Sequence, residues 1–237
     1  KYLKRNIELS VNKQEVIKSL YRPFSLRYLY FNRYLNAMQY RWRDIYQADN
    51  IWIAVPNISS PKEFCVLVSK HLINLNFHSG GAQCLPRYRY EQDGTRTDNI
   101  TDWGLKQFTD HYQDKNISKQ DIFHYTYAVL HNPAYRKKYE INLKREFPRL
   151  PFYKDFFKWV TWGQELTELH INYETIEPYP LNIHKTAEKE NPKAKLQAIP
   201  KEGKIILDEN TAITGVPSKA WEYKLGNRSA LHWILDQ

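Results

Sequence analysis

The sequence predicts an α+β protein in which sheet regions, mixed or antiparallel, flank a central helical segment. Runs dense in Tyr, Trp, Ile and Val occur in the first hundred residues and return after residue 195, and such runs are typical of strands. Between them, apolar residues recur at helical spacing. Strands and helices are therefore grouped along the chain, which does not fit the alternation of a doubly wound parallel sheet.

The first hundred residues are predicted to begin with a helix and to continue as strands. Residues 12–20 carry apolar side chains on one helical face, and Pro23 ends this helix. Residues 91–102 are polar and predict an exposed loop. The expected strands cover residues 27–32, 50–55, 64–69, 71–77 and 86–90, of which the third and fourth are candidates for a hairpin.

The central segment is predicted to hold three helices. Ser118 is a suitable N-cap for the first, with Asp121 at the third helical position. Asn132 and Pro133 then break the pattern and start a second helix. A third helix is expected over residues 152–172.

The last part of the chain is predicted to return to strands after an irregular segment. Residues 174–193 are charged, contain prolines and indicate a linker or long loop. Residues 229–236 are expected to form a closing helix. The expected strands cover residues 195–199, 204–207 and 220–224.

The charge balance favours a polyanionic partner. The 237 residues include 35 Lys and Arg against 26 Asp and Glu, for a formal net charge of +9. Residues 21–43 hold five arginines and no acid, and residues 136–158 hold eight basic residues against three acidic ones. Basic clusters of this kind are typical of nucleic-acid-binding proteins. Nucleic acid is therefore the leading candidate for the partner.

Composition excludes several other classes of protein. With 42% apolar and 15% aromatic residues, the chain is not disordered. Its apolar runs have the length of strands and are far shorter than the ~18 residues of a membrane span. There is no leader in which a basic segment precedes an apolar one, so nothing in the sequence indicates secretion. Cys65 and Cys84 are too far apart for a CxxC unit, so a reduced, cytoplasmic chain is expected. Because Met38 is the single methionine and the chain starts at Lys1, we expect a piece of a longer protein.

Residues 83–99 are the best candidate for contact with DNA bases. Arginine reads guanine bidentately, Asn and Gln read adenine, and tyrosine packs on sugar or base. On a continuous strand, Arg87 and Arg89 would share one face and the neighbouring tyrosines the other. The alternative is an edge strand whose arginines are merely solvated. The candidate DNA-binding residues are Gln83, Arg87, Tyr88, Arg89, Arg96 and Asn99, with Arg41 and Arg43 as phosphate contacts.

Two catalytic patterns compete with this interpretation. Asp208 followed by Glu222 and Lys224 on a strand has the outline of a Mg²⁺-dependent nuclease, in which two carboxylates hold the metal and the lysine orients water. Residues 132–135 (NPAY) resemble the Asn-Pro-Pro-Tyr loop of DNA amino-methyltransferases, but no glycine-rich cofactor loop precedes them, so a helix break is the preferred interpretation. Neither GxxxxGK[ST] nor HExxH occurs. A helical scaffold that binds protein is a further alternative.

Several longer motifs resemble one family. The sequence is similar, over about residues 20 to 237, to the C-terminal specificity domain of Type ISP restriction–modification enzymes and related predicted helicases. One departure lies at Arg87 and Arg89, because the family segment usually reads Phe-Pro-Leu-Tyr-Leu-Tyr where this chain has LPRYRY. The motifs that carry the resemblance are residues 21–24 (YRPF) with 27–30, 125–136 (YTYAVLHNPAYR), 147–152 (FPRLPF), 163–170, 213–217 (ITGVP), 220–223 and 226–231 (GNRSAL) with Trp233.

The resemblance implies a DNA target-recognition domain without catalytic residues. In such enzymes one polypeptide also carries a nuclease, a helicase-like ATPase and an amino-methyltransferase, so S-adenosylmethionine, ATP and Mg²⁺ are expected only in those upstream domains. It implies that residues 1–20 form a linker helix from a preceding methyltransferase domain. Residues 21–237 would then form the recognition domain, β-rich over 21–100, helical over 101–172, and ending in a β-hairpin and closing helix over 195–237.

Overall fold

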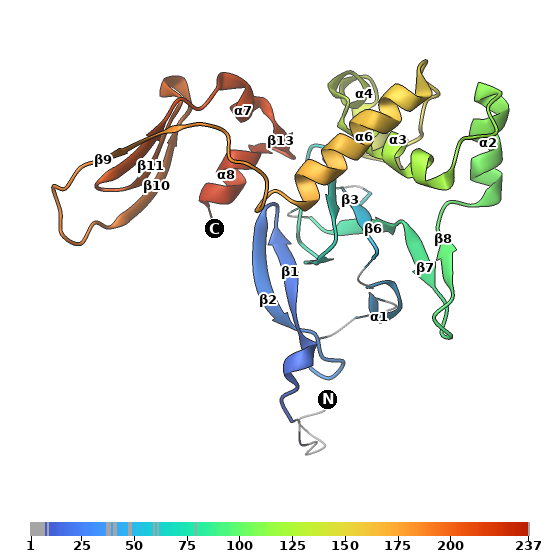
Figure 1. Cartoon of the computed structure of the whole chain (residues 1–237), viewed down its shortest axis with the longest axis horizontal. Coiled ribbons are helices and arrows are strands. Elements are labelled where there is room, and N and C mark those ends of the chain that lie inside the picture. Colours follow the sequence, from blue (N-terminus) through green and yellow to red (C-terminus); the bar gives the residue numbers. More distant parts are fainter. Residues whose placement is uncertain are drawn as a thin grey trace.

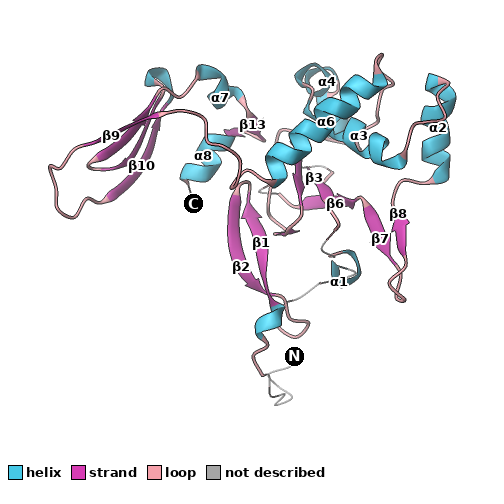
Figure 2. Cartoon of the chain, in the orientation of Figure 1, coloured by secondary structure: helices cyan, strands magenta, loops and turns pink. Residues whose placement is uncertain are grey.

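The computed structural model describes residues 8, 10–36, 39, 42–46, 49–58, 60, 62–78 and 80–236. Its fold is α+β, as predicted, with several small sheets around a central group of helices (Figure 2). One sheet has four strands, and Figure 1 shows it at one end of the longest axis. Toward the other end lie the helices α2 (Asp102–Tyr112), α3 (Lys119–His131) and α4 (Pro133–Lys138). A hairpin of β1 (Val16–Arg22) and β2 (Ser25–Tyr30) lies between these ends.

The N-terminal sheet is built from β1 (Val16–Arg22), β2 (Ser25–Tyr30) and β5 (Leu72–Ile73), after a short 3₁₀ turn η2 (Lys13–Glu15). β1 pairs antiparallel with β2 and parallel with β5. The helix predicted over residues 12–20 is therefore wrong. The β-branched Val16 and Ile17 suit a strand, and pairing with two partner strands overrides the helical spacing.

The central sheet has β3 (Trp52–Pro56) between β4 (Leu67–Ser69) and β6 (Ala82–Pro86). All five residues of β3 are buried, because both faces of the strand are covered. Ile53 and Val55 pack into the core formed with the helices, whereas Trp52 and Ala54 pack into a second core that includes Trp233. This alternation is that of a strand between two apolar layers. The hairpin predicted over residues 64–77 is wrong, since β4 and β5 belong to different sheets.

A separate hairpin of β7 (Tyr88–Tyr90) and β8 (Arg96–Asp98) follows the central sheet. β8 lies within the segment predicted to be a loop. The short helix α1 (Trp42–Ile45) precedes β3 in the chain and contacts β7.

The helical segment confirms the predicted start of its main helix. Ser118 caps α3 (Lys119–His131) and accepts from the backbone of Asp121, whose carboxylate accepts from Ser118 N–H in return. Asn132 caps the next helix as predicted. The other helices are α2 (Asp102–Tyr112), α4 (Pro133–Lys138), α5 (Glu140–Leu143) and α6 (Phe156–Ile171).

Helices α3 and α6 pack so closely that a glycine is required between them. A Cβ atom on Gly163 would lie 1.9 Å from the backbone oxygen of His124. That position accepts no side chain without movement of a helix backbone. The glycine therefore fixes the distance between the two longest helices of the core.

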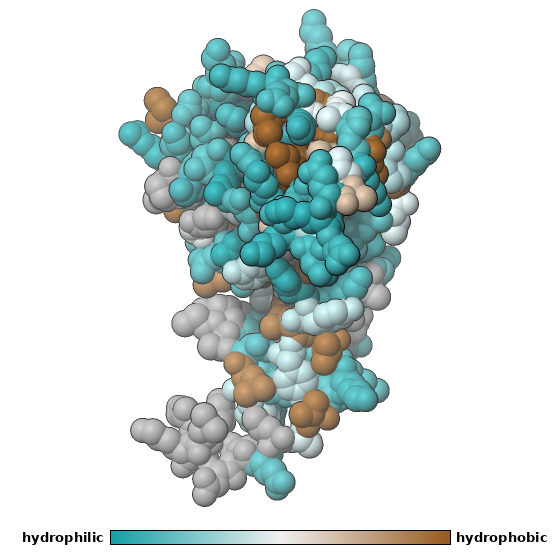
Figure 3. Space-filling model, turned by 90° about the vertical axis from the view of Figure 1, so that its left-hand side faces the viewer, coloured by the Kyte–Doolittle hydropathy of each residue, from teal (hydrophilic) through white to brown (hydrophobic). Residues whose placement is uncertain are grey.

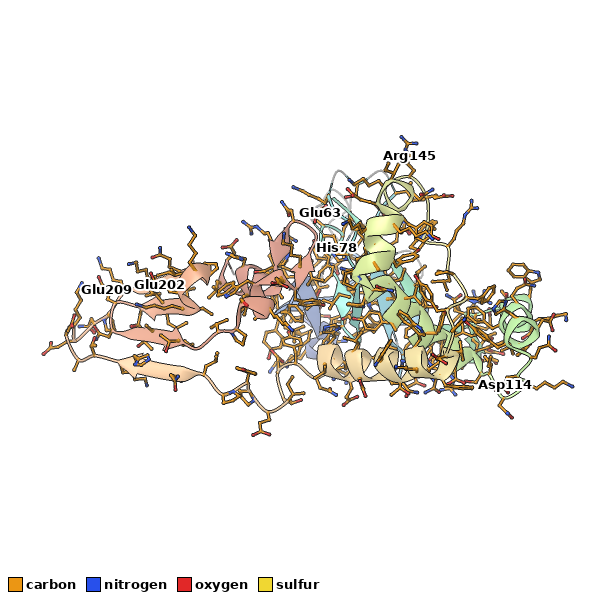
Figure 4. All side chains as sticks on the ribbon, turned by 90° about the horizontal axis from the view of Figure 1, so that it is seen from above. Glu63, His78, Asp114, Arg145, Glu202 and Glu209 are labelled. Atoms are coloured by element: carbon orange, nitrogen blue, oxygen red, sulfur yellow. The ribbon has the colours of Figure 1, made fainter. Side chains whose placement is uncertain are left out.

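The C-terminal part contains a four-stranded antiparallel sheet in the order β10-β11-β12-β9. Figure 4 shows Glu202 and Glu209 at this end of the molecule and Asp114 at the other end. Figure 3 looks at this end and shows a mostly hydrophilic surface with scattered apolar atoms. The strands are β9 (Asn182–Lys185), β10 (Ala194–Ile199), β11 (Lys204–Asp208) and β12 (Thr211–Thr214), with a 3₁₀ turn η3 (Pro200–Glu202).

The chain ends in α7 (Ser218–Glu222), a small hairpin of β13 (Lys224–Leu225) and β14 (Arg228–Ser229), and α8 (Ala230–Leu235). The strand predicted over residues 220–224 is wrong, because Trp221 lies on a helical turn and packs near the ring of His232 on α8. The loop predicted over residues 174–193 contains β9. The predicted closing helix is confirmed.

Cys65 and Cys84 are free thiols. Among the helices of the described residues, none combines the length and the apolar character that crossing a membrane needs.

Candidate nucleic-acid interface

The β7–β8 hairpin carries three of the candidate DNA-binding residues, Tyr88, Arg89 and Arg96, and is held at its base by buried Asn50. The Asn50 Nδ2 atom donates to the carbonyl of Tyr88 at 2.9 Å, and its Oδ1 atom accepts from the Tyr88 N–H at 3.0 Å. On the opposite strand, the Asn99 side chain donates to the carbonyl of Pro86 at 2.9 Å. Asn99 therefore connects the hairpin to β6 through its Nδ2 atom.

A carboxylate holds the outer part of the hairpin. The Tyr90 hydroxyl donates to Asp49 Oδ1 at 2.5 Å, and Arg96 donates to Asp49 Oδ2 at 2.7 Å. These bonds to Tyr90 and Arg96 lower the pKa of the Asp49 carboxyl. Burial, and then the bond to Asp49, raise the pKa of Tyr90 to about 12. The charge of Arg96 is thus already matched within the protein.

Unlike Arg89, which lies on β7, Arg87 interrupts the continuous strand on which the predicted alternation depended. It lies at a bend between β6 and β7, and its guanidinium donates to Gln120 of α3 at 2.6 Å. Burial lowers the pKa of His124 on the same helix, and the positive charge of Arg87 adds to this effect. The guanidinium groups of Arg87 and Arg96 lie 4.6 and 4.4 Å from the ring centre of Tyr88. The Tyr88 ring is therefore engaged by two arginines.

Arg89 and Gln83 differ from the other candidates because both are exposed. Within the described part of the chain, neither side chain makes a hydrogen bond or ion pair, so both are available to an external partner. Arg41 lies outside the described residues. Arg43 lies on α1, and its side chain is also outside the described part.

The residues of the nuclease alternative do not have the predicted arrangement. Glu222 ends α7 and Lys224 begins β13, so they are not two residues apart on one strand face. Asp208 lies at the end of β11 and accepts from the backbone of Asn210 at 2.7 Å. Within the residues described, no group of three His, Cys, Asp or Glu side chains could hold a metal ion.

Comparison with known proteins identifies the family. The model of the Type ISP C-terminal specificity domain matches residues 1–237. The chain belongs to this family. No curated protein matches it.

Three solved structures are similar to this specificity domain. The DrdV–DNA complex, determined by cryo-electron microscopy, shares 45% identity with a TM-score of 0.90 over 96% of this chain. A nuclease-deletion mutant of the Type ISP restriction–modification enzyme LlaGI, in complex with a DNA substrate mimic, shares 32% identity with a TM-score of 0.77 over 98%. The ATP-dependent Type ISP restriction–modification enzyme LlaBIII, bound to DNA, shares 26% identity with a TM-score of 0.84 over 99%. The chain spans 24%, 21% and 16% of those chains, respectively.

Sequence reasoning missed the residues that shape the specificity domain's hairpin. Asp49, Asn50 and Gln120 bind hairpin residues that lie between 33 and 47 positions away in the chain. No local pattern indicates such partners. The composition of residues 83–99 could show that arginines were present, but not which of them remained free.

Proposed function

We propose that this specificity domain recognises a double-stranded DNA sequence for a larger restriction–modification enzyme and presents it to an amino-methyltransferase upstream in the same polypeptide. The observation that carries the proposal is the 45% identity to DrdV over 96% of this chain, in a structure that contains DNA. The domain itself catalyses no reaction in this proposal. S-adenosylmethionine, ATP and Mg²⁺ bind only to the other domains, and the enzyme acts in the cytoplasm.

Within this function, the exposed arginine of the β7–β8 hairpin is the best candidate for a base contact. Arg89 has no internal partner in the described part of the chain, whereas Arg87 donates to Gln120 and Arg96 to Asp49. A bidentate contact of arginine with guanine contributes about 1–3 kcal/mol of discrimination. Arg87 would instead support the hairpin from the side of α3. Gln83 is exposed on β6 and is the second candidate reader.

The test is a map of the sites that the full-length enzyme methylates. Arg89→Ala should relax specificity at one base pair, while Arg43→Ala should lower methylation of all sites alike, as expected for a phosphate contact. Lys154→Gln removes an exposed cation elsewhere on the domain and serves as the control. An Arg89→Ala enzyme that methylates the same sites at unchanged relative rates would show that Arg89 does not read DNA. If the Arg89, Arg87 and Gln83 variants all methylate the same sites as the wild type, the hairpin is not part of the recognition surface.

A further inference from the structure

A basic hollow of about 570 Å³ lies where the end of β1 meets the β13–β14 hairpin and α8. Three cations from distant parts of the chain line it, together with a single carboxylate. Figure 4 shows Glu63, the neighbour of one of these cations, near the middle of the molecule rather than at either end. The lining includes Tyr21, Arg22, Lys62, Asn227, Arg228 and Asp236.

Arg22 is held in place without being neutralised. Its half-buried guanidinium donates to the carbonyl of Tyr21 at 3.0 Å and to Asn74 Oδ1 at 3.5 Å, and both acceptors are uncharged. It also lies 4.3 Å from the ring centre of Tyr21. A fixed guanidinium loses little further freedom when it binds an anion. The geometry therefore presents one preorganised positive charge.

The β13–β14 turn places two more polar groups at the same hollow. Gly226 has a φ of 68° and Asn227 does not have a positive φ, the pattern of a type II′ turn. This turn directs Asn227 and Arg228 to the lining. Arg228 pairs with Asp236, and both side chains remain about half exposed, at 48% and 45%.

Lys62 supplies the third cation. Its backbone N–H donates to Ser60 Oγ at 3.2 Å, and within the described residues its ammonium group has no ion-pair partner. Three cations thus face one carboxylate, Asp236, which leaves a net charge of +2 in the lining. A positive charge of this size, with the side-chain amide of Asn227 beside it, is suited to an anion that accepts several hydrogen bonds.

We propose that this hollow binds one phosphate group of the DNA backbone, apart from the segment that contacts bases. The proposal rests on the proposed function. The volume is large enough for a phosphodiester with its sugars, and the exposed ring of Tyr21 offers a surface against which a sugar packs. Figure 1 shows β1 and α8 on one side of the central sheet and the β7–β8 hairpin on the other. The two contacts would therefore fix the orientation of the domain on the duplex.

The test is the salt dependence of duplex binding by this chain, measured by fluorescence anisotropy. Each phosphate contact contributes about 0.9 to the slope of log K against log salt. Lys62→Gln and Arg228→Gln should each make the slope shallower and weaken target and non-target duplexes by the same factor. Lys62 is the cleaner variant, because its side chain holds no other residue in the described part of the chain. Lys154→Gln, which removes an exposed lysine far from the hollow in sequence, is the matched control.

The outcomes separate this site from the function as a whole. Suppose that the wild-type chain binds DNA and that the salt slopes of Lys62→Gln and Arg228→Gln equal that of Lys154→Gln. The phosphate site would then be overturned, and the proposed function would stay intact. No duplex binding by the wild type would overturn both. In a second arm, inorganic phosphate is titrated by calorimetry. If Lys62→Gln loses phosphate binding but keeps the wild-type salt slope for duplex binding, the hollow is a site for small anions. That result would overturn its assignment to DNA.

Discussion

The hydroxyl of Tyr223 lies 3.1 Å from Nε2 of His170, although 53 residues separate them in the chain. Their rings are stacked with centres 5.7 Å apart. On the other side of the same imidazole, the Tyr127 hydroxyl lies 2.6 Å from Nδ1. A neutral imidazole has one donor and one acceptor nitrogen, so two hydroxyls satisfy it without a charge. This contact ties the C-terminal part of the specificity domain to α3 and α6.

The stability of the domain should fall as the pH is lowered from about 6.5 toward 4. Burial lowers the pKa of His170 to about 4. It lowers the pKa of His78 to about 4 in the same way. Below the ordinary histidine pKa of ~6.5, the unfolded chain takes up protons that the folded chain does not, so the folded state loses stability. The loss is at most about 1.4 kcal/mol per pH unit for each histidine.

Urea unfolding between about pH 7 and pH 5 measures this loss. A His170→Gln variant is the comparison, because it keeps a polar side chain but does not titrate. Its unfolding free energy should depend less on pH than that of the wild type. Equal pH dependence in the two proteins would contradict a neutral, buried His170.

Gly163→Ala should destabilise the domain by about 1–3 kcal/mol, the usual cost of overpacking a core. The new methyl group would meet the backbone oxygen of His124 at 1.9 Å, and a helix backbone cannot move aside as a side chain can. Gly104→Ala is the matched control, since this second helical glycine has its nearest neighbours at 3.5 Å. It should be neutral or stabilising by up to about 1 kcal/mol. Thermal unfolding measures the stability of both variants. Similar melting temperatures for the two would contradict the close packing of α3 and α6.

Asp49→Ala should loosen the β7–β8 hairpin without unfolding the domain. It removes the acceptor shared by Tyr90 and Arg96. Because both side chains of the Asp49–Arg96 pair are about half exposed, at 54% and 52%, the change in global stability should stay below about 1 kcal/mol. Hydrogen exchange should become faster for the amides of β7 and β8 only. Lys106→Ala breaks an exposed ion pair on α2 and should leave the hairpin unchanged; equal exchange in both variants would show that Asp49 does not order it.

The chain should show no turnover with plasmid DNA, Mg²⁺, ATP and S-adenosylmethionine. The motivation is the arrangement of the nuclease alternative, in which Glu222 ends a helix instead of facing Lys224 along a strand. Gel electrophoresis, phosphate release and methyl transfer measure the three reactions. Activity in the wild type that disappears in Glu222→Ala would contradict a purely binding role.

The fold could be predicted where local chemistry decides it. The capping box of Ser118 and Asp121, and the cap at Asn132, depend on residues within a few positions of one another. Residues 12–20 were predicted wrongly, because their strand is stabilised by a distant partner: the Ser19 hydroxyl donates to the carbonyl of Leu72 at 2.9 Å. The site follows the same rule. Its arginines were visible in the sequence, whereas the bond from Arg87 to Gln120 and the meeting of Lys62 with Arg228 arise only from tertiary structure.

DNA recognition by this domain is tested most directly by measuring duplex binding in EDTA, with salt varied from about 50 to about 200 mM. We predict binding without metal, with a dissociation constant of roughly 10⁻⁴–10⁻⁶ M for non-specific duplex and an affinity that falls steeply as salt rises, because the contacts of a +9 chain release counterions. An affinity that does not change with salt, or the absence of any binding at low salt, would contradict the claim that this domain recognises DNA.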